Sequence, residues 1–275
     1  MRVLITGHKG QLGRALARRL PEAAGVDMPE VDIADAAALE AAVQAARPDV
    51  IFHCAAMTDV DGAARDPALA YRVNGLGTQN VALAAARAGA AVVYISTNEV
   101  FDGASQTPYS EFDATHPLNA YARSKLAGEW FVTHLLSRFY IARTAWLSAS
   151  GGRNFVHRIM QLADERGSLR VVTDEVANPS FVEDLAPALI RLAASEHYGI
   201  YHLTNAGYCS RYEYARTVLQ MSGRGHVPVE AITLADYPRP SPPPPFTPLA
   251  NTAAAALGIS LRPWQEALAD FLRAQ

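Results

Sequence analysis

Residues 3–20 read VLITGHKGQLGRALARRL, and they decide the fold. Residues 3–5 form a short apolar run typical of a buried parallel strand, and residues 11–20 have the composition of a helix. Between the two lies a G-x-x-G-x-x-G loop made by Gly7, Gly10 and Gly13. After a strand and before a helix, such a loop turns tightly and lets the backbone approach a pyrophosphate at the helix N-terminus. The stretch therefore predicts an α/β fold that binds a dinucleotide.

Short apolar runs keep alternating with Ala-rich helical stretches up to about residue 145. Further strands are expected at 24–26, 50–52, 92–95 and 139–142, and further helices near 35–46, 67–88 and 119–137. This alternation is typical of a parallel sheet covered by helices on both faces. We predict a doubly wound, Rossmann-type NAD(P)-binding domain over residues 1–145, to which later segments can return.

The second part of the chain has a different character. Short strands are expected at 169–172 and 200–203, but the regular alternation weakens, which indicates a smaller, mainly substrate-binding lobe over residues 146–275. Seven of the eleven residues from Pro238 to Pro248 are proline. Proline fixes φ and lacks a backbone N–H, so this segment is expected to be a stiff surface loop.

Composition and charge exclude several classes of protein. Of the 275 residues, 50% are hydrophobic and 19% charged, as in ordinary globular chains. The formal net charge of −3 gives no bulk attraction to nucleic acid or to an anionic membrane. No apolar run approaches the roughly 18 residues of a membrane span, and no signal peptide is recognisable at the start. A cytoplasmic protein is expected, with Cys54 and Cys209 as buried free thiols and no metal site.

The end of the second strand suggests which dinucleotide binds. Asp27 follows Gly7 by twenty residues, where an acidic side chain accepts a hydrogen bond from the adenosine ribose and repels a 2′-phosphate. The choice between NADH and NADPH therefore leans toward NADH, with Lys9 and Arg14 available as counter-charges for a phosphate. The other predicted cofactor contacts are loop and strand-end residues: Gly7, Gly10, Gln11, Leu12, Asp32, Ile33, Ala55 and Ala56.

Tyr121 and Lys125 form the predicted catalytic pair. Only two of the 24 basic residues are lysine, and a spacing of four places Lys125 on the same helix face as Tyr121. A nearby ammonium stabilises a phenolate, so it is expected to lower the pKa of the tyrosine and to help it transfer a proton. Thr97 ends a buried strand, where parallel sheets place their ligands. With a nicotinamide, these three side chains predict a site of hydride transfer to a carbonyl group.

Three segments together resemble the dTDP-4-dehydrorhamnose reductase family of extended short-chain dehydrogenase/reductases. They are the glycine loop with Gln11-Leu12, residues 96–103 (STNEVFDG) and residues 121–129 (YARSKLAGE). Further similar segments lie at 143–146, 152–156, 178–180, 199–203 and 261–264. The resemblance implies that NAD(P)H reduces the 4-keto group of a dTDP-linked 6-deoxy sugar, with catalysis by Thr97, Tyr121 and Lys125. It also implies that Tyr121 donates the proton and that the substrate is bound by Trp146, Asn154 and Pro179.

One pair of residues departs from the family pattern. Asn98-Glu99 stands where the family usually has Asp-Tyr, and the pair is expected to lie against the substrate. Thr-Asn-Glu is also similar to the Thr-Asp-Glu of nucleotide-sugar 4,6-dehydratases, but Asn98 lacks the acid of those enzymes. Two alternatives stay open. One is an NAD(P)-binding regulatory subunit resembling the methionine adenosyltransferase β-subunit, and the other is an epimerase or dehydratase with Glu99 as base. A homodimer is also left open.

Overall fold

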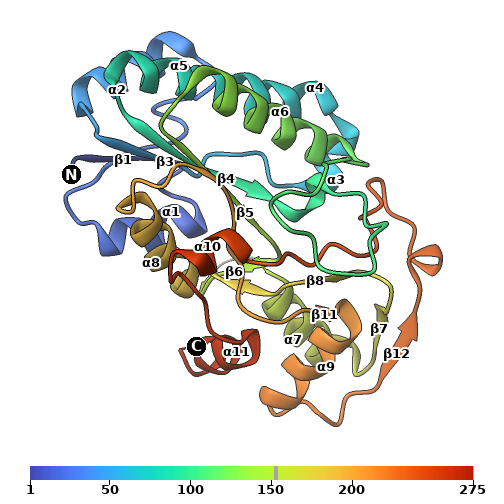
Figure 1. The fold of residues 1–275 in the computed structure, drawn as a ribbon. Coiled ribbons are helices and arrows are strands. Elements are labelled where there is room, and N and C mark those ends of the chain that lie inside the picture. The colour runs from blue at the N-terminus through green and yellow to red at the C-terminus, as the bar shows by residue number, and fades with distance from the viewer. Residues whose placement is uncertain (152–153, 275) are drawn as a thin grey trace.

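A six-stranded parallel sheet forms the centre of the computed structural model, which describes residues 1–151 and 154–274. The strand order is β10-β5-β4-β3-β1-β2 (Figure 1). The chain thus moves outward from β1 in both directions, and ligands of such sheets bind where the order reverses. The predicted doubly wound α/β fold is confirmed. The strands are β1 (Val3–Thr6), β2 (Ala24–Val26), β3 (Val50–His53), β4 (Ala91–Thr97), β5 (Phe139–Thr144) and β10 (Gly199–His202).

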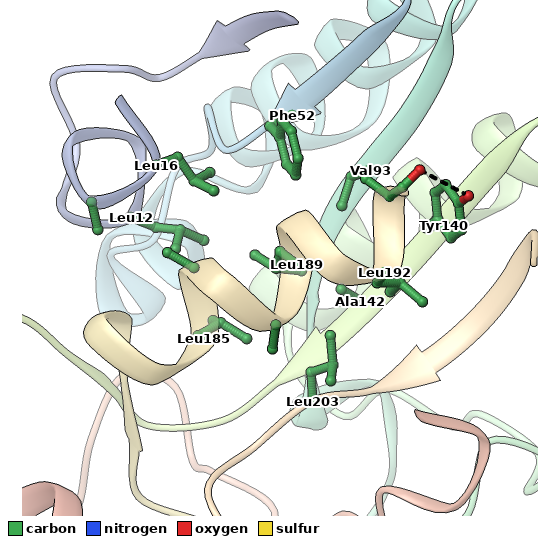
Figure 2. Close-up of a cluster of buried hydrophobic side chains, with 14 of the residues drawn as sticks. Leu12, Leu16, Phe52, Val93, Tyr140, Ala142, Leu185, Leu189, Leu192 and Leu203 are labelled. Carbon is green, nitrogen blue, oxygen red and sulfur yellow. Dashed lines mark hydrogen bonds between the residues drawn. The ribbon is translucent and has the colours of Figure 1, made fainter. Parts of the chain in front are cut away.

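Helices cover both faces of this sheet. One face carries α2 (Ala36–Ala46), α5 (Thr78–Ala88) and α6 (Ala120–Leu135), and the other carries α1 (Gln11–Arg19) and α8 (Val182–Ala193). On the second face, leucines of α1 and α8 pack against the strand side chains Phe52, Val93 and Tyr140 (Figure 2). The central strands are buried along their length because both faces are covered. This explains why their sequences are continuously apolar.

The segment expected to be one helix over 67–88 is interrupted. It begins as α4 (Pro67–Ala70), widens into a π-helix at Tyr71–Gly77 and continues as α5. The buried Asn74 lies inside the π-helix, where its Nδ2 donates to Ser124 Oγ at 2.9 Å and its Oδ1 accepts from the Met57 N–H at 2.8 Å. Asn74 thereby ties the loop after β3 to α6. Such wide turns frequently occur at functional sites.

A second group of elements packs beside the carboxyl ends of the central strands (Figure 1). Its apolar core contains Phe181, Tyr214 and Trp264. Two elements that follow residue 145 return to the first lobe: strand β10 joins the central sheet and helix α8 packs against it. The boundary between the two lobes stays a prediction. Residues 152 and 153, within one of the similar segments, lie outside the described residues. The other elements are α3 (Val60–Arg65), β6 (Leu147–Ser148), α7 (Phe155–Arg166), β7 (Leu169–Val172), β8 (Val176–Ala177), β9 (Ser180–Phe181), β11 (Cys209–Ser210), α9 (Arg211–Met221), β12 (Val229–Ile232), α10 (Thr252–Ala256) and α11 (Trp264–Arg273).

The proline-rich segment 238–248 is less superficial than expected. Ser241, Thr247 and Pro248 are buried, and the Thr247 N–H donates to the Val176 carbonyl at 2.9 Å. The Pro248 carbonyl accepts from the Tyr109 N–H at 2.8 Å. Because proline carbonyls still accept hydrogen bonds, this segment can connect β8 to the loops that follow β4. The segment is a loop, as expected, with Pro238, Pro240, Pro242 and Pro245 exposed, but it lies only partly at the surface.

Candidate active site

The glycine loop between β1 and α1 approaches other backbone segments too closely for side chains at two of its positions. Gly7 adopts φ +69°, and a Cβ there would lie 2.6 Å from the Ala55 backbone nitrogen. A Cβ on Gly13 would collide with the backbone of Gly7 and His8. Gly10 caps α1 without a side-chain hydrogen bond, so no side chain of the cap covers the first N–H groups of the helix. Leu12 is buried in the core, which leaves its main chain to contact a ligand.

The residues expected at the adenosine end lie close together after β2. Asp27 accepts hydrogen bonds from the backbone N–H groups of Lys9, at 2.8 Å, and of Met28, at 2.9 Å. Asp27 thus joins the end of β2 to the glycine loop. Lys9 Nζ forms an exposed ion pair with Glu30 at 2.6 Å. Glu30 was not predicted, since nothing in its local sequence indicates that it meets Lys9.

Asp32, Ile33, Ala55 and Ala56 flank this region in different ways. The Asp32 carboxylate lies 3.5 Å from the Arg72 guanidinium, at the start of the π-helix. Ile33 is buried in the core, where its side chain packs against α2 and α5. Ala55 and Ala56 are half-buried in the loop after β3, and Ala55 lies beside Gly7. The small side chains there leave the backbone of the loop close to the glycines.

The carboxyl end of β4 presents three polar side chains in succession. The Thr97 hydroxyl accepts a hydrogen bond from the Glu99 N–H at 3.2 Å and donates to Asn98 Oδ1 at 3.3 Å. Asn98 Nδ2 donates to Thr247 Oγ1 at 2.6 Å, so Asn98 links β4 to the proline-rich segment. Glu99 Oε2 accepts from Asn119 Nδ2 at 2.7 Å. The partners of Asn98 and Glu99 are far away in sequence, and no local pattern predicts them.

Helix α6 begins directly beside this strand end. Asn119 is its N-cap, and Asn119 Oδ1 accepts from the Ala122 N–H at 2.8 Å. Tyr121 is half-buried and Lys125 is only 3% exposed, with Lys125 Nζ 4.2 Å from the centroid of the Tyr94 ring. Lys125 also interacts electrostatically with Cys54, at the end of β3 and one residue before Ala55. Thr97, Tyr121, Lys125 and the loop against Gly7 therefore form one region at the carboxyl edge of the sheet.

The pKa values in this region differ from the expectation for Tyr121. Burial and the neighbouring Glu99 raise the pKa of Tyr121 above its ordinary value, and the hydrogen bond with Thr97 only partly opposes this. The expected lowering of the Tyr121 pKa by Lys125 is therefore wrong, because burial and Glu99 determine the direction of the shift. Burial lowers the pKa of Lys125 to about 7, against the attraction of Glu129. Tyr121 is protonated at neutral pH, as a proton donor must be.

A buried ion pair connects helix α6 to strand β5. Arg143 Nη2 lies 2.7 Å from Glu129 Oε2, with each side chain 4% exposed, and Glu129 Oε1 also accepts from Ser96 Oγ at 2.5 Å. This network joins β5 and α6 to β4 at Ser96, the residue that precedes Thr97. Arg143 Nε and Nη2 both donate to Glu129, and such paired charge-assisted hydrogen bonds fix the relative position of the two side chains, whereas Arg143 Nη1 is buried without a hydrogen-bond partner among the described residues. Sequence reasoning missed Glu129 and Arg143, although an arginine inside the apolar run 139–144 was a usable signal.

The residues expected to bind substrate come from the second lobe. Trp146 adopts φ 42°, and the Arg211 guanidinium lies 3.7 Å from the centroid of its ring. Asn154 caps α7 through a hydrogen bond from the His157 N–H at 3.0 Å. Pro179 is buried next to Ser180, whose N–H donates to the Trp146 carbonyl at 3.3 Å. Trp146 and Pro179 are thus brought together, while Asn154 is the N-cap of the neighbouring helix α7.

Two negative findings apply to the described part of the chain. Among residues 1–151 and 154–274, no three His, Cys, Asp or Glu side chains are grouped as a metal ion would need. Over the same residues, no helix combines the length and apolar character needed to cross a membrane.

Comparisons with known proteins agree on one family. Residues 1–275 match the family described as RmlD substrate binding domain. The chain is 40% identical to dTDP-4-dehydrorhamnose reductase of Mycobacterium tuberculosis, over 99% of this chain and 93% of that protein. Two solved dTDP-4-dehydrorhamnose reductases, from Clostridium acetobutylicum and from Bacillus anthracis in complex with NADP, are each 36% identical. Each has a TM-score of 0.96 and covers 100% of this chain and 99% of its own. The chain therefore belongs to the dTDP-4-dehydrorhamnose reductase family, which shares the RmlD substrate binding domain.

Proposed function

We propose that this protein reduces the 4-keto group of a dTDP-linked 6-deoxy sugar with NAD(P)H. The main support for the proposal is that Thr97, Tyr121 and Lys125 lie close together beside the glycine loop. The names of the relatives, and the NADP bound to the Bacillus anthracis protein, support the same assignment. A nicotinamide bound at the loop would supply the hydride to the carbonyl carbon.

The three side chains have separate roles in this proposal. Tyr121 donates the proton to the carbonyl oxygen, and its raised pKa keeps the hydroxyl protonated at neutral pH until the carbonyl oxygen gains negative charge. The Thr97 hydroxyl, which already contacts the Glu99 backbone, holds the same oxygen. Lys125 binds the ribose hydroxyls of the cofactor and supplies positive charge once Tyr121 has lost its proton.

In our proposal, residues of the second lobe and of the loop after β4 bind the substrate. Trp146 and Pro179 form one side of this site, and Asn98 and Asn154 supply polar groups for the sugar nucleotide. Glu99 lies beside them with its carboxylate engaged by Asn119. Arg211 and Arg239 lie within electrostatic reach of Glu99, so they bring positive charge toward an anionic nucleotide. These two arginines extend the set of residues predicted from the sequence.

A turnover screen tests the proposed function. Purified protein is supplied with dTDP-linked and other 4-keto sugar nucleotides, with NADH and NADPH in parallel, and loss of absorbance at the nicotinamide band is followed. Oxidation of the cofactor with formation of the 4-hydroxy sugar supports the proposal. Cofactor binding without turnover of any 4-keto sugar nucleotide would contradict it and favour a regulatory subunit. Solvent deuterium at sugar C5 would instead indicate epimerase chemistry at Glu99.

The preference between the two cofactors depends, in our proposal, on Lys9 and Glu30. Lys9 is tied by its backbone to Asp27, where the adenosine ribose binds in this fold, and Glu30 holds its ammonium. Glu30→Gln frees that ammonium for a 2′-phosphate and is expected to improve the Kd for NADPH relative to NADH by about two- to fivefold, as for exposed ion pairs. Lys9→Met should shift the ratio toward NADH.

Fluorescence titration of NADH and NADPH measures both constants directly. Glu22→Gln is the matched control, because Glu22 is an exposed glutamate that precedes β2. It should leave the ratio of the two constants unchanged. An unchanged ratio in both Glu30→Gln and Lys9→Met would show that another residue selects the cofactor.

A further inference from the structure

Glu99 makes a contact that its place in the sequence does not suggest. Its carboxylate is half-buried and accepts the hydrogen bond from Asn119 Nδ2 at 2.7 Å. The same Asn119 amide is 6% exposed and uses its oxygen to cap the Ala122 N–H at 2.8 Å. Asn119 therefore bridges Glu99 to the first turn of α6. The next residue but one in the chain is Tyr121.

The backbone of Glu99 makes a second contact with the site. Its N–H donates to Thr97 Oγ1 at 3.2 Å. Residue 99 thus touches the hydroxyl of Thr97 through its main chain and the start of the Tyr121 helix through its side chain. A side chain without a carboxylate or amide oxygen at position 99 could not accept the Asn119 hydrogen bond in this way. The contact therefore depends on the carboxylate of Glu99.

We propose that Glu99 is a positioning residue: its carboxylate holds Asn119 at the start of α6 and so keeps the Tyr121 hydroxyl beside Thr97. The proposal rests on the proposed function, in which Tyr121 donates the proton. Glu99 acts on Tyr121 through Asn119, which contacts both the Glu99 carboxylate and the first turn of α6. A small displacement of the donor is costly in proton transfer, which requires the two heavy atoms to be within hydrogen-bond reach.

The charged and titratable groups around Glu99 come from four parts of the chain. Glu175 lies before β8, Arg211 begins α9, Arg239 belongs to the proline-rich segment, and Tyr121 is on α6. Both arginines are engaged elsewhere: Arg211 pairs with Glu175 at 2.9 Å, and Arg239 lies 3.4 Å from Asp61. Asn119 is the neutral donor that contacts the Glu99 carboxylate directly.

These surroundings determine the direction of the pH effect. Burial, reinforced by Glu175, raises the pKa of Glu99 above its ordinary 4.5, although Asn119 and the arginines oppose the rise. As the pH falls through that raised pKa, Glu99 becomes neutral and its hydrogen bond with Asn119 loses its charge assistance. As the pH is lowered, the turnover rate of the wild-type protein is therefore expected to fall at a higher pH than the one at which ordinary exposed carboxylates become protonated.

Glu99→Gln and Glu99→Ala separate the charge from the contact. Glutamine keeps an oxygen for Asn119, so kcat should fall only about fivefold, the difference between a charged and a neutral hydrogen bond. It should also remove the acid-side decline from the pH profile. Alanine removes the acceptor and should lower kcat further, by about twentyfold or more. KM for the sugar nucleotide should change less than about twofold in both.

Two further measurements make the test decisive. Asn119→Ala and the double variant Glu99→Ala/Asn119→Ala should have similar kcat values, because Glu99 acts through Asn119. Glu266→Gln, an exposed glutamate in the first turn of α11, is the control and should leave the pH profile unchanged. An increase in KM at constant kcat would show that Glu99 binds substrate and would overturn the positioning role. Retention of the acid-side decline in Glu99→Gln would overturn it as well.

Hydrogen exchange tests the contact without any turnover. In Glu99→Ala, the amides at the start of α6, Ala122 among them, should exchange faster than in wild type, and in Glu99→Gln nearly as slowly as in wild type. Faster exchange together with an inactive wild-type protein would support the contact and contradict the reductase function. Unchanged exchange in Glu99→Ala, with an active wild type, would overturn the positioning proposal alone.

Discussion

Tyr121→Phe is expected to lower kcat about 10³-fold, within the range that a positioned general acid contributes. The phenylalanine ring fills the same half-buried space at the start of α6 and lacks only the hydroxyl. Burial raises the pKa of Tyr121, so the wild-type hydroxyl is protonated throughout the neutral range, and the variant loses this positioned proton donor. The Kd for NADPH should change less than about twofold, because the ring remains.

Steady-state kinetics and cofactor titration on the same preparations measure both effects. Tyr198→Phe is the matched control. Tyr198 precedes β10 at the opposite edge of the sheet, where its hydroxyl accepts from Arg138 Nε at 2.9 Å. Removal of that hydroxyl should leave kcat within about twofold of wild type. If Tyr121→Phe reduces a 4-keto sugar nucleotide as fast as wild type does, another group donates the proton and Tyr121 only lines the site.

The features that sequence reasoning predicted are those determined by neighbours in the chain. The glycine loop lies directly between a strand and a helix, and Gly10 and Gly13 have local steric reasons, whereas the contact that Gly7 requires is with the backbone of Cys54 and Ala55. The spacing of Tyr121 and Lys125 follows from the helical period alone. Continuous apolar runs likewise predicted the central strands, because strands covered on both faces lose the alternation of polar and apolar residues.

The missed features depend on residues that are distant in sequence. Asn98 meets Thr247, and Arg143 packs under Glu129 in a network whose members are polar residues in otherwise apolar segments. The π-helix within 67–88 arises because Asn74 bonds to two other segments, which a local propensity cannot show. The lobe boundary near residue 145, the cytoplasmic location and the homodimer remain predictions.

Lys125→Met is expected to abolish most of the activity and yet to stabilise the folded protein. Lys125 is 3% exposed, and burial lowers its pKa from the ordinary 10.5 to about 7. Each pKa unit corresponds to about 1.36 kcal/mol, so keeping this ammonium charged in the folded protein costs on the order of 5 kcal/mol. Methionine fills a similar volume beside Tyr94 and requires no hydration, although it loses the contact of the ammonium with that ring.

The pH dependence distinguishes this cost from an ordinary packing effect. Below pH 7 the lysine is charged in both states, and wild type bears the full cost of burying the charge. Between about 7 and 10.5 only the unfolded state binds the proton, so the free energy of unfolding of wild type rises with pH. Denaturant unfolding of both proteins without ligand should therefore show Lys125→Met more stable by a few kcal/mol at pH 6, with the difference shrinking toward pH 10. Groups that titrate alike in both proteins cancel in this difference.

A stability difference that does not change from pH 6 to pH 10 would mean that burial does not depress the pKa of Lys125. A less stable Lys125→Met at pH 6 would mean that the ammonium gains more from Glu129 and the Tyr94 ring than burial costs. Arginine would bear a greater cost at this position, since its guanidinium stays charged at every accessible pH. A buried lysine can instead release its proton near neutral pH and regain it when an anionic tyrosinate forms nearby. This is a physical reason for a lysine at position 125 in a chain that otherwise uses arginine almost exclusively.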